Sequence, residues 1–146
     1  MSRAQTSGFT LVEMAVTILV LGMLFAFSIP AFQSVNASYQ LKGATENLAA
    51  QLRLAREKAM ATGTDQPMHW APGFMSSDYH IHFASGYVPP TGKWKLPRGI
   101  TFYTWGIHPI MTRDGRISGS GLVILQDTRG TRDTVSFLTS GLVLTK

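Results

Sequence analysis

The sequence predicts an α+β fold, in which a long N-terminal helix packs on a C-terminal antiparallel β-sheet or small β-sandwich. Three observations lead to this expectation: an apolar run over residues 9–29, an amphipathic helical pattern over residues 30–62, and short β-rich runs separated by turns over residues 63–146. One helix followed by a series of strands is typical of α+β domains. The length of 146 residues leaves room for a single globular domain.

The apolar run over residues 9–29 carries a single charge, on Glu13. A helix of this length spans about 30 Å, the thickness of the hydrocarbon core of a bilayer. The apolar stretch of a secretory signal peptide is shorter, and neither a signal peptide nor a plain membrane anchor explains the acid. A charge at the centre of a membrane helix costs roughly 2.5–3.5 kcal/mol, and less near its end, so we expect Glu13 to have a partner.

The second part of the predicted helix is amphipathic. Gly22 and Pro30, which precede this part, both weaken a helix. Either the segment between these two residues loosens, or Pro30 alone produces a kink. Beyond Pro30, apolar residues recur at spacings of three and four, which predicts one buried helix face. These residues are Leu41, Ala44, Leu48, Leu52, Ala55 and Ala59. Arg53 and Glu57 lie outside this apolar face and are spaced as an i,i+4 ion pair. Gly63 is a signal for the end of the helix.

The remainder of the chain predicts short strands. The runs rich in β-branched and aromatic residues cover residues 79–83, 99–105, 121–127, 133–138 and 141–145. The turn around Gly130 predicts a hairpin that joins residues 122–126 to residues 134–138. Residues 71–77 and 85–98, which are rich in proline and glycine, are expected to be loops.

The residues from Gly8 to Glu13, with the sequence GFTLVE, resemble the cleavage and methylation motif of type IV pilins and pseudopilins. The resemblance implies that a prepilin peptidase of the inner membrane cuts between Gly8 and Phe9, and that Phe9 is then N-methylated. It also implies that Glu13 pairs with the Phe9 amine of a neighbouring subunit in a filament. Since an unpaired buried acid is costly, this contact would set the register of each subunit.

The remainder of the chain resembles the GspH/FimT-type minor pseudopilins, through NLAAQLRLAREKAMATG in the helix and the glycine turns and paired apolar runs after residue 112. The resemblance implies four parts: a leader at residues 1–8, a transmembrane segment at 9–29, an amphipathic segment at 30–62 and a periplasmic head at 63–146. It implies an H-type minor pseudopilin near the tip of a short filament that helps to drive type II secretion. Its partners would be other pseudopilins or pilins, the peptidase, the inner-membrane assembly platform and lipid.

Two classes of chemistry receive little support. His69, His80 and His82 could supply metal ligands, but histidines that alternate on an exposed strand face, as His80 and His82 do, are more often solvated surface. There are no cysteines, which excludes a disulfide framework and a thiol nucleophile, and no nucleophile motif for a hydrolase is present. We therefore expect no metal, no cofactor and no enzymatic activity.

The net charge of +5 is compatible with a nucleic-acid role but does not require one. Turn-borne cations could make weak DNA contacts, as in the FimT-like pilins that this chain resembles; the candidates are Arg113, Arg116, Arg129 and Arg132. Those proteins carry an arginine element in their C-terminal tail, which residues 141–146 lack. Nearby aspartates also offset the charge, so solvated turns are the favoured interpretation.

Three functions remain open on the sequence alone. The favoured one is the type II secretion pseudopilin, and the alternative is a minor type IV pilin in pilus biogenesis or DNA uptake. A lone membrane-anchored binding domain is the third. Secretion and pilus systems use the same leader, peptidase and helix, so the motif does not separate them.

Overall fold

The computed structural model describes residues 9–70, 78–81 and 93–146. The chain divides into two compact units, residues 1–36 and residues 37–146. Helix α1 (Leu11–Thr62) gives its first part to one unit and its second part to the other, and it ends at Gly63, which has a φ of 64°. This left-handed conformation costs glycine nothing and is a common way for a helix to end. The predicted helix is therefore confirmed.

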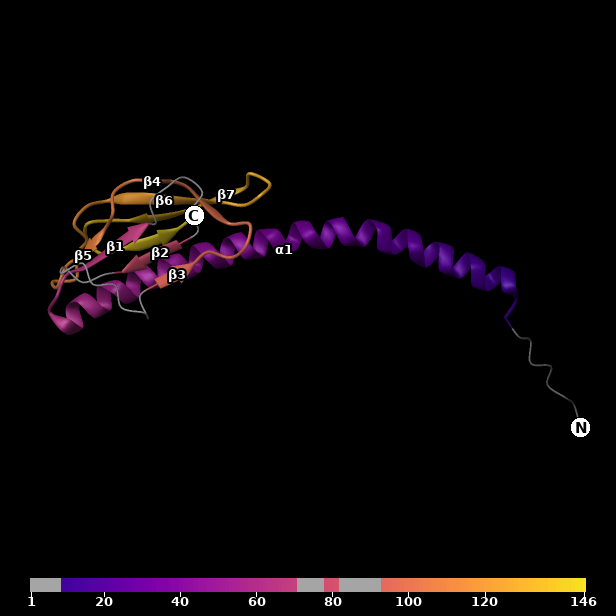
Figure 1. The fold of residues 1–146 in the computed structure, drawn as a ribbon, viewed down its shortest axis with the longest axis horizontal. Helices are drawn as coiled ribbons and strands as arrows, with labels where there is room; N and C mark the ends of the chain where they lie inside the picture. Colours follow the sequence, from indigo (N-terminus) through magenta and orange to yellow (C-terminus); the bar gives the residue numbers. More distant parts are fainter. Residues whose placement is uncertain (1–8, 71–77, 82–92) are drawn as a thin grey trace, which may run out of the picture. The chain divides into compact units, whose positions relative to one another are not determined.

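In the described residues of the second unit, two four-stranded antiparallel sheets follow the helix, and both lie on one side of the second part of α1 (Figure 1). The first sheet has the order β3 (Lys93–Lys95), β2 (Asp78–Ile81), β1 (Gln66–Trp70), β5 (Ile110–Met111). The second has the order β4 (Thr101–Trp105), β6 (Gly121–Gln126), β7 (Arg132–Phe137), β8 (Val143–Thr145). This arrangement confirms the predicted α+β class.

The predicted hairpin is the centre of the second sheet. Strands β6 and β7 pair in register from Gly121↔Phe137 to Gln126↔Arg132, and Gly130 at the tip has a φ of 84°. Alternate side chains along both strands point into the core, as period-two alternation requires. The buried members are Val123, Leu125, Val135 and Phe137.

The core of this unit lies between the helix and the sheets. All six residues of the predicted apolar stripe are buried, from Leu41 at 3% exposure to Ala59 at 0%. Ala44, Ala55 and Ala59 are small and buried, so the strands can pack close to the helix backbone. The stripe is thus core, as its spacing predicts.

The sequence interpretation was wrong or incomplete for the short strands of the first sheet. Residues 93–95 were expected to belong to a loop but form β3, and β1 and β5 were not predicted. These strands contain two to five residues, and β1 and β5 are distant in sequence, since Pro67 of β1 pairs with Ile110 of β5. Pairing of this kind leaves no local signal. The expected loop at 71–77 and the end of the expected strand, His82 and Phe83, lie outside the described residues.

Candidate assembly site at the N-terminus of the helix

Thr10 and Glu13 form a reciprocal cap at the start of α1. The Glu13 carboxylate accepts hydrogen bonds from the Thr10 backbone N–H and from its hydroxyl, both at 2.8 Å. The Glu13 backbone N–H donates in turn to the Thr10 hydroxyl at 3.2 Å. This is the capping-box arrangement of a threonine followed three residues later by a glutamate. The cap satisfies the acid locally and holds it at the N-terminal end of the helix, next to Phe9.

The side chains around this cap form an apolar surface without protein neighbours within the first unit. Phe9 is 78% exposed and Leu11 is 86% exposed. The first part of α1 has a mean hydropathy of 2.3 and is long and apolar enough to cross a membrane. An exposed apolar surface of this size needs lipid or other helices around it. The structure thus brings together an apolar span, a capped acid and the residue expected to become the N-terminus.

Gly22 and Pro30, the two helix-weakening residues, lie within this span, and α1 continues through both. A methyl group added at Gly22 would meet nothing within 4 Å. The glycine is therefore not required by packing inside the first unit. Loosening of the segment between the two residues stays a prediction. Gly8, the other residue of the predicted cleavage site, lies outside the described residues.

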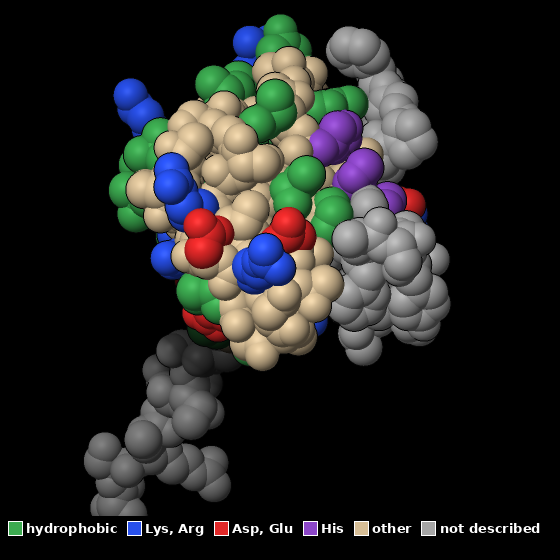
Figure 2. Space-filling model, turned by 90° about the vertical axis from the view of Figure 1, so that its left-hand side faces the viewer, with side chains coloured by type: hydrophobic (Ala, Val, Ile, Leu, Met, Phe, Trp, Pro, Cys, Tyr) green, Lys and Arg blue, Asp and Glu red, His purple; other side chains and the backbone are tan. Residues whose placement is uncertain are grey.

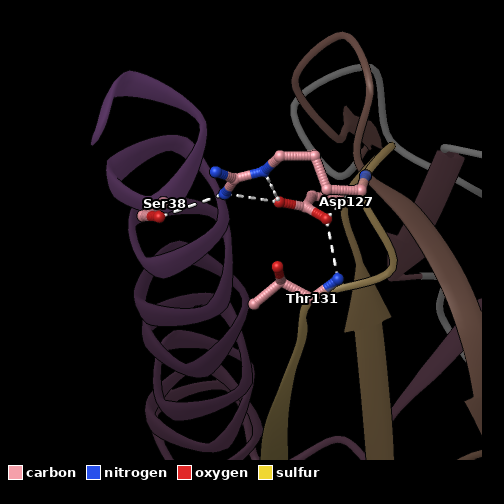
Figure 3. A network of polar contacts seen from close by, with 4 residues as sticks. Ser38, Asp127 and Thr131 are labelled. Carbon is pink, nitrogen blue, oxygen red and sulfur yellow. Dashed lines mark hydrogen bonds and ion pairs between the residues drawn. The ribbon is translucent and has the colours of Figure 1, made fainter. Parts of the chain in front are cut away.

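A partly buried ion pair in the turn of the β6–β7 hairpin is linked to the second part of α1 by a hydrogen bond (Figure 3). Asp127 is 5% exposed, and the Arg129 Nη2 lies 2.8 Å from its Oδ2. The same Arg129 nitrogen donates to the Ser38 hydroxyl on the helix at 3.0 Å. The backbone N–H groups of Arg129 and Thr131 donate to Asp127 Oδ1 at 2.9 and 2.8 Å. We call this group of residues the Arg129 clamp.

Burial alone would raise the pKa of Asp127, but the hydrogen bonds from Arg129 and Thr131 and the guanidinium charge together lower it below its usual value. The carboxylate is therefore ionised at neutral pH, and the clamp is a charged contact. Its helix partner, Ser38, is 91 residues away from Arg129 in the sequence. No local pattern indicates such a contact.

Two further arginines join the helix to the second sheet and its turns. Arg53 Nη2 donates to the Val143 carbonyl at 2.9 Å, and Arg56 Nε donates to the Gly115 carbonyl at 2.6 Å. Gly141 lies against this second contact, because a Cβ at this residue would come within 2.4 Å of the Gly115 oxygen. The turns at residues 115 and 141 therefore pack backbone to backbone beneath Arg56.

The four arginines proposed for weak DNA contacts do not form one cluster. Arg129 belongs to the clamp near Ser38, and the Arg132 guanidinium lies 3.6 Å from the centre of the Tyr103 ring. Arg113 and Arg116 lie in the turn beside Arg56, and the Arg113 backbone N–H donates to Asp65 at 3.0 Å. Residues 38 and 56 of one helix are separated by roughly 27 Å along its axis. The two pairs therefore lie at different ends of the sheet.

The histidines are stacked. His69 and His80 are cross-strand neighbours on β1 and β2, with ring centres 5.8 Å apart, and His108 stacks on His69 at 4.7 Å. Figure 2 shows the described histidines side by side on the surface. Nearly parallel rings cannot aim their nitrogens at one ion, and the described residues contain no group of three potential ligands. His108 was missed by the sequence analysis, and His82 lies outside the described residues.

Comparison with known proteins agrees with this geometry. The family described as the prokaryotic N-terminal methylation motif matches residues 3–29. No curated protein matches the sequence. The fold is similar to that of the minor pseudopilin EpsH of the Vibrio cholerae type 2 secretion system, with a TM-score of 0.61 and 11% identity over 73% of this chain and 96% of that one.

The type IV minor pilin FimU of Pseudomonas aeruginosa is similar to the same degree, with a TM-score of 0.61 and 20% identity over 75% of this chain and 90% of that one. The two likenesses cover 73% and 75% of this chain and concern its fold. The chain therefore carries the N-terminal methylation motif and has a fold similar to those of a minor pseudopilin and a minor pilin.

Proposed function

We propose that this protein is a minor pseudopilin of a type II secretion system, of the H type, that acts near the tip of a short periplasmic filament. Its role is structural: the helix anchors the subunit in the bacterial inner membrane and later packs among the helices of its neighbours. The head lies in the periplasm. In this proposal the protein carries out no catalysis and binds no cofactor.

The observation that carries the proposal is the Thr10–Glu13 cap on an otherwise apolar helix. In lipid the carboxylate would be costly without hydrogen bonds, and Thr10 supplies two of them. In a filament the Phe9 amine of a neighbouring subunit would add an opposite charge at the same end of the helix. An ion pair in these apolar surroundings fixes the axial position of a subunit, because one helical turn of slip would break it.

The division of the chain follows from the same proposal. Residues 1–8 are a leader that the prepilin peptidase removes, residues 9–29 cross the membrane, and residues 30–62 continue the helix into the periplasm. Residues 63–146 complete the head. Cleavage between Gly8 and Phe9 exposes the Phe9 amine, which is then N-methylated.

Intact-mass measurement of the membrane-extracted protein tests the cleavage. We expect a chain that begins at N-methylated Phe9, and we expect Gly8→Ala to slow or block the cut. Phe9→Leu, which keeps an apolar residue on the other side of the bond, serves as the matched control and should still be cut. A mature protein that retains residues 1–8, or one that is cut beyond residue 29, would contradict the proposal.

A minor type IV pilin is the second candidate, because the fold is as similar to that of FimU as to that of EpsH, with a TM-score of 0.61 for each. Both candidates use the same membrane span and cap. Deletion of the gene separates them: loss of secreted proteins with normal surface pili supports the pseudopilin, whereas loss of pili with normal secretion supports the pilin.

A further inference from the structure

Strand β8 forms one edge of the second sheet, and its backbone groups alternate between the sheet and the helix side. Thr134 and Lys146 exchange two backbone hydrogen bonds of 2.9 Å, and Leu138 donates to the Leu142 carbonyl at 2.9 Å. In an antiparallel pair such bonded positions alternate with positions whose N–H and C=O point away from the partner. The outward positions of β8 are therefore Val143 and Thr145.

Among the described residues, only one of these two positions makes a hydrogen bond on the side that faces away from β7. The Val143 carbonyl accepts a hydrogen bond from Arg53 at 2.9 Å, which confirms that this edge faces the helix. The N–H and C=O of Thr145 point in the same direction, and no described group bonds to them. Protein sheets usually cover or blunt an open edge, since unpaired edge groups attract further strands.

A groove runs beside the open part of this edge, between the strand and α1. Its volume of about 500 Å³ falls in the range of ligand sites in proteins. The helix contributes one wall, and the end of the β6–β7 hairpin and the end of β8 contribute the other. The lining residues are Ser38, Leu41, Lys42 and Glu46 on the helix, and Thr131, Arg132, Asp133, Thr145 and Lys146 on the sheet.

The charges that the groove offers to a partner are mainly positive. Arg132 is engaged with Tyr103 and Gln126, and the Asp133 carboxylate accepts from the Thr134 N–H at 2.9 Å. Lys42, Lys146 and Glu46 make no side-chain hydrogen bond or ion pair among the described residues. With Arg132 and Asp133 included, the side chains of the lining carry three cations and two acids, a net positive charge that favours a partner segment with a carboxylate.

We propose that the open edge of β8 and this groove accept an extended, acidic segment of a neighbouring filament subunit as an additional strand. The Thr145 N–H and C=O bond to its backbone, and Lys42 and Lys146 contact its carboxylate. Addition of a strand to an open sheet edge is a common way in which proteins bind peptides. The inference rests on the proposed function, because it assigns a second contact to a subunit that assembles through its helix.

A substitution at Thr145 separates this contact from the fold. Proline at this position removes the outward N–H but leaves the bonds between β7 and β8, which use residues 142 and 146. Thr145→Val keeps the N–H and the branched side chain, and is the matched control. In sheared filaments, normalised to equal membrane levels, we expect Thr145→Pro to reduce incorporation at least fivefold and Thr145→Val to change it less than twofold.

Hydrogen exchange at the Thr145 amide gives an independent readout in the wild-type protein. We expect fast exchange in detergent-solubilised monomer and at least tenfold slower exchange in filaments, with Lys42→Glu lowering incorporation because it reverses a groove charge. Equal incorporation of the proline and valine variants, or unchanged exchange at Thr145 in filaments that contain the protein, overturns the inference. If the wild-type protein is absent from filaments, the proposed function fails and the inference fails with it.

Discussion

Glu13 meets two different requirements with one carboxylate. In the isolated chain its Oε2 accepts both hydrogen bonds from Thr10, and in the proposed filament the carboxylate would face a neighbouring amine. The sequence analysis identified the acid from its position in an apolar run but missed Thr10. The signal was present, since a threonine three residues before a glutamate at a helix start is the capping-box pattern. The residue that stabilises the acid could therefore have been predicted together with it.

Substitutions at Glu13 should affect assembly and spare earlier steps. Glu13→Ala makes the span more apolar, so we expect normal membrane insertion and normal cleavage after Gly8. Incorporation into filaments should fall, because the neighbouring amine loses its counter-ion. Glu13→Gln keeps the shape and one hydrogen-bond acceptor without the charge, and should also assemble poorly. Crosslinking to neighbouring subunits at matched membrane levels measures incorporation. If Glu13→Ala crosslinks as efficiently as the wild-type protein, Glu13 is not the register contact.

The Arg129 clamp should make the stability of the head depend on pH. The pKa of Asp127 is lowered in the folded protein, so its contribution is complete above the ordinary carboxylate range and is lost as the pH falls through the lowered value. Asp127→Asn should reduce the free energy of unfolding by about 2 kcal/mol at neutral pH, a typical value for charged hydrogen bonds. Urea unfolding of the wild-type protein and of Asp127→Asn at pH 7 and at pH 3 measures this difference. An equal loss of unfolding free energy at both pH values would contradict the charge argument.

At the scale of the elements, local patterns account for what could be predicted. Helix α1 follows from a long apolar run and a stripe at helical spacing, and the β6–β7 hairpin follows from alternation on both sides of a glycine turn. Strands β1, β3 and β5 are short, and β1 pairs with β5 across a long stretch of sequence, so pairing with other strands determines them more than their own residues do. The clamp between Ser38 and Arg129 was unpredictable for the same reason.

Substitution by alanine should change the stability of the second unit in opposite directions at two of its glycines, Gly141 and Gly43. Gly141 has a φ of 85°, and a Cβ there would meet the Gly115 oxygen at 2.4 Å and Arg56 Nε at 2.6 Å. Gly141→Ala should therefore destabilise the head by about 2 kcal/mol or more, from backbone strain and displacement of the turn.

Gly43, the control, is in the helix and has nothing within 4 Å of an added Cβ. Gly43→Ala should stabilise the head by up to about 1 kcal/mol through helix propensity. Thermal unfolding of both variants measures the difference. Similar melting temperatures for the two would show that the contact between the turns at residues 115 and 141 is loose in solution.

At the scale of the whole molecule, the distribution of charge argues against a role in DNA uptake. The candidate arginines lie in two separate turns, and two of them are held by Asp127 and Tyr103. A protein that displaces few counterions binds DNA weakly, and its affinity changes little with salt concentration. We expect the head to bind duplex DNA weakly and without sequence preference in anisotropy titrations at physiological salt. Sub-micromolar binding that Arg129→Ala combined with Arg132→Ala abolishes would support the uptake pilin.

The contact between Arg129 and Ser38 has a practical consequence for work on the head without detergent. A fragment of residues 37–146 discards the apolar first part of the helix and keeps both the clamp and Leu41, the first buried residue of the stripe. A fragment that begins at residue 45 leaves Arg129 without its hydroxyl partner and uncovers the core beside Leu48. We expect the longer fragment to be a soluble monomer by light scattering and the shorter one to melt at a lower temperature and to aggregate. A stable soluble fragment of this chain must therefore begin before Ser38.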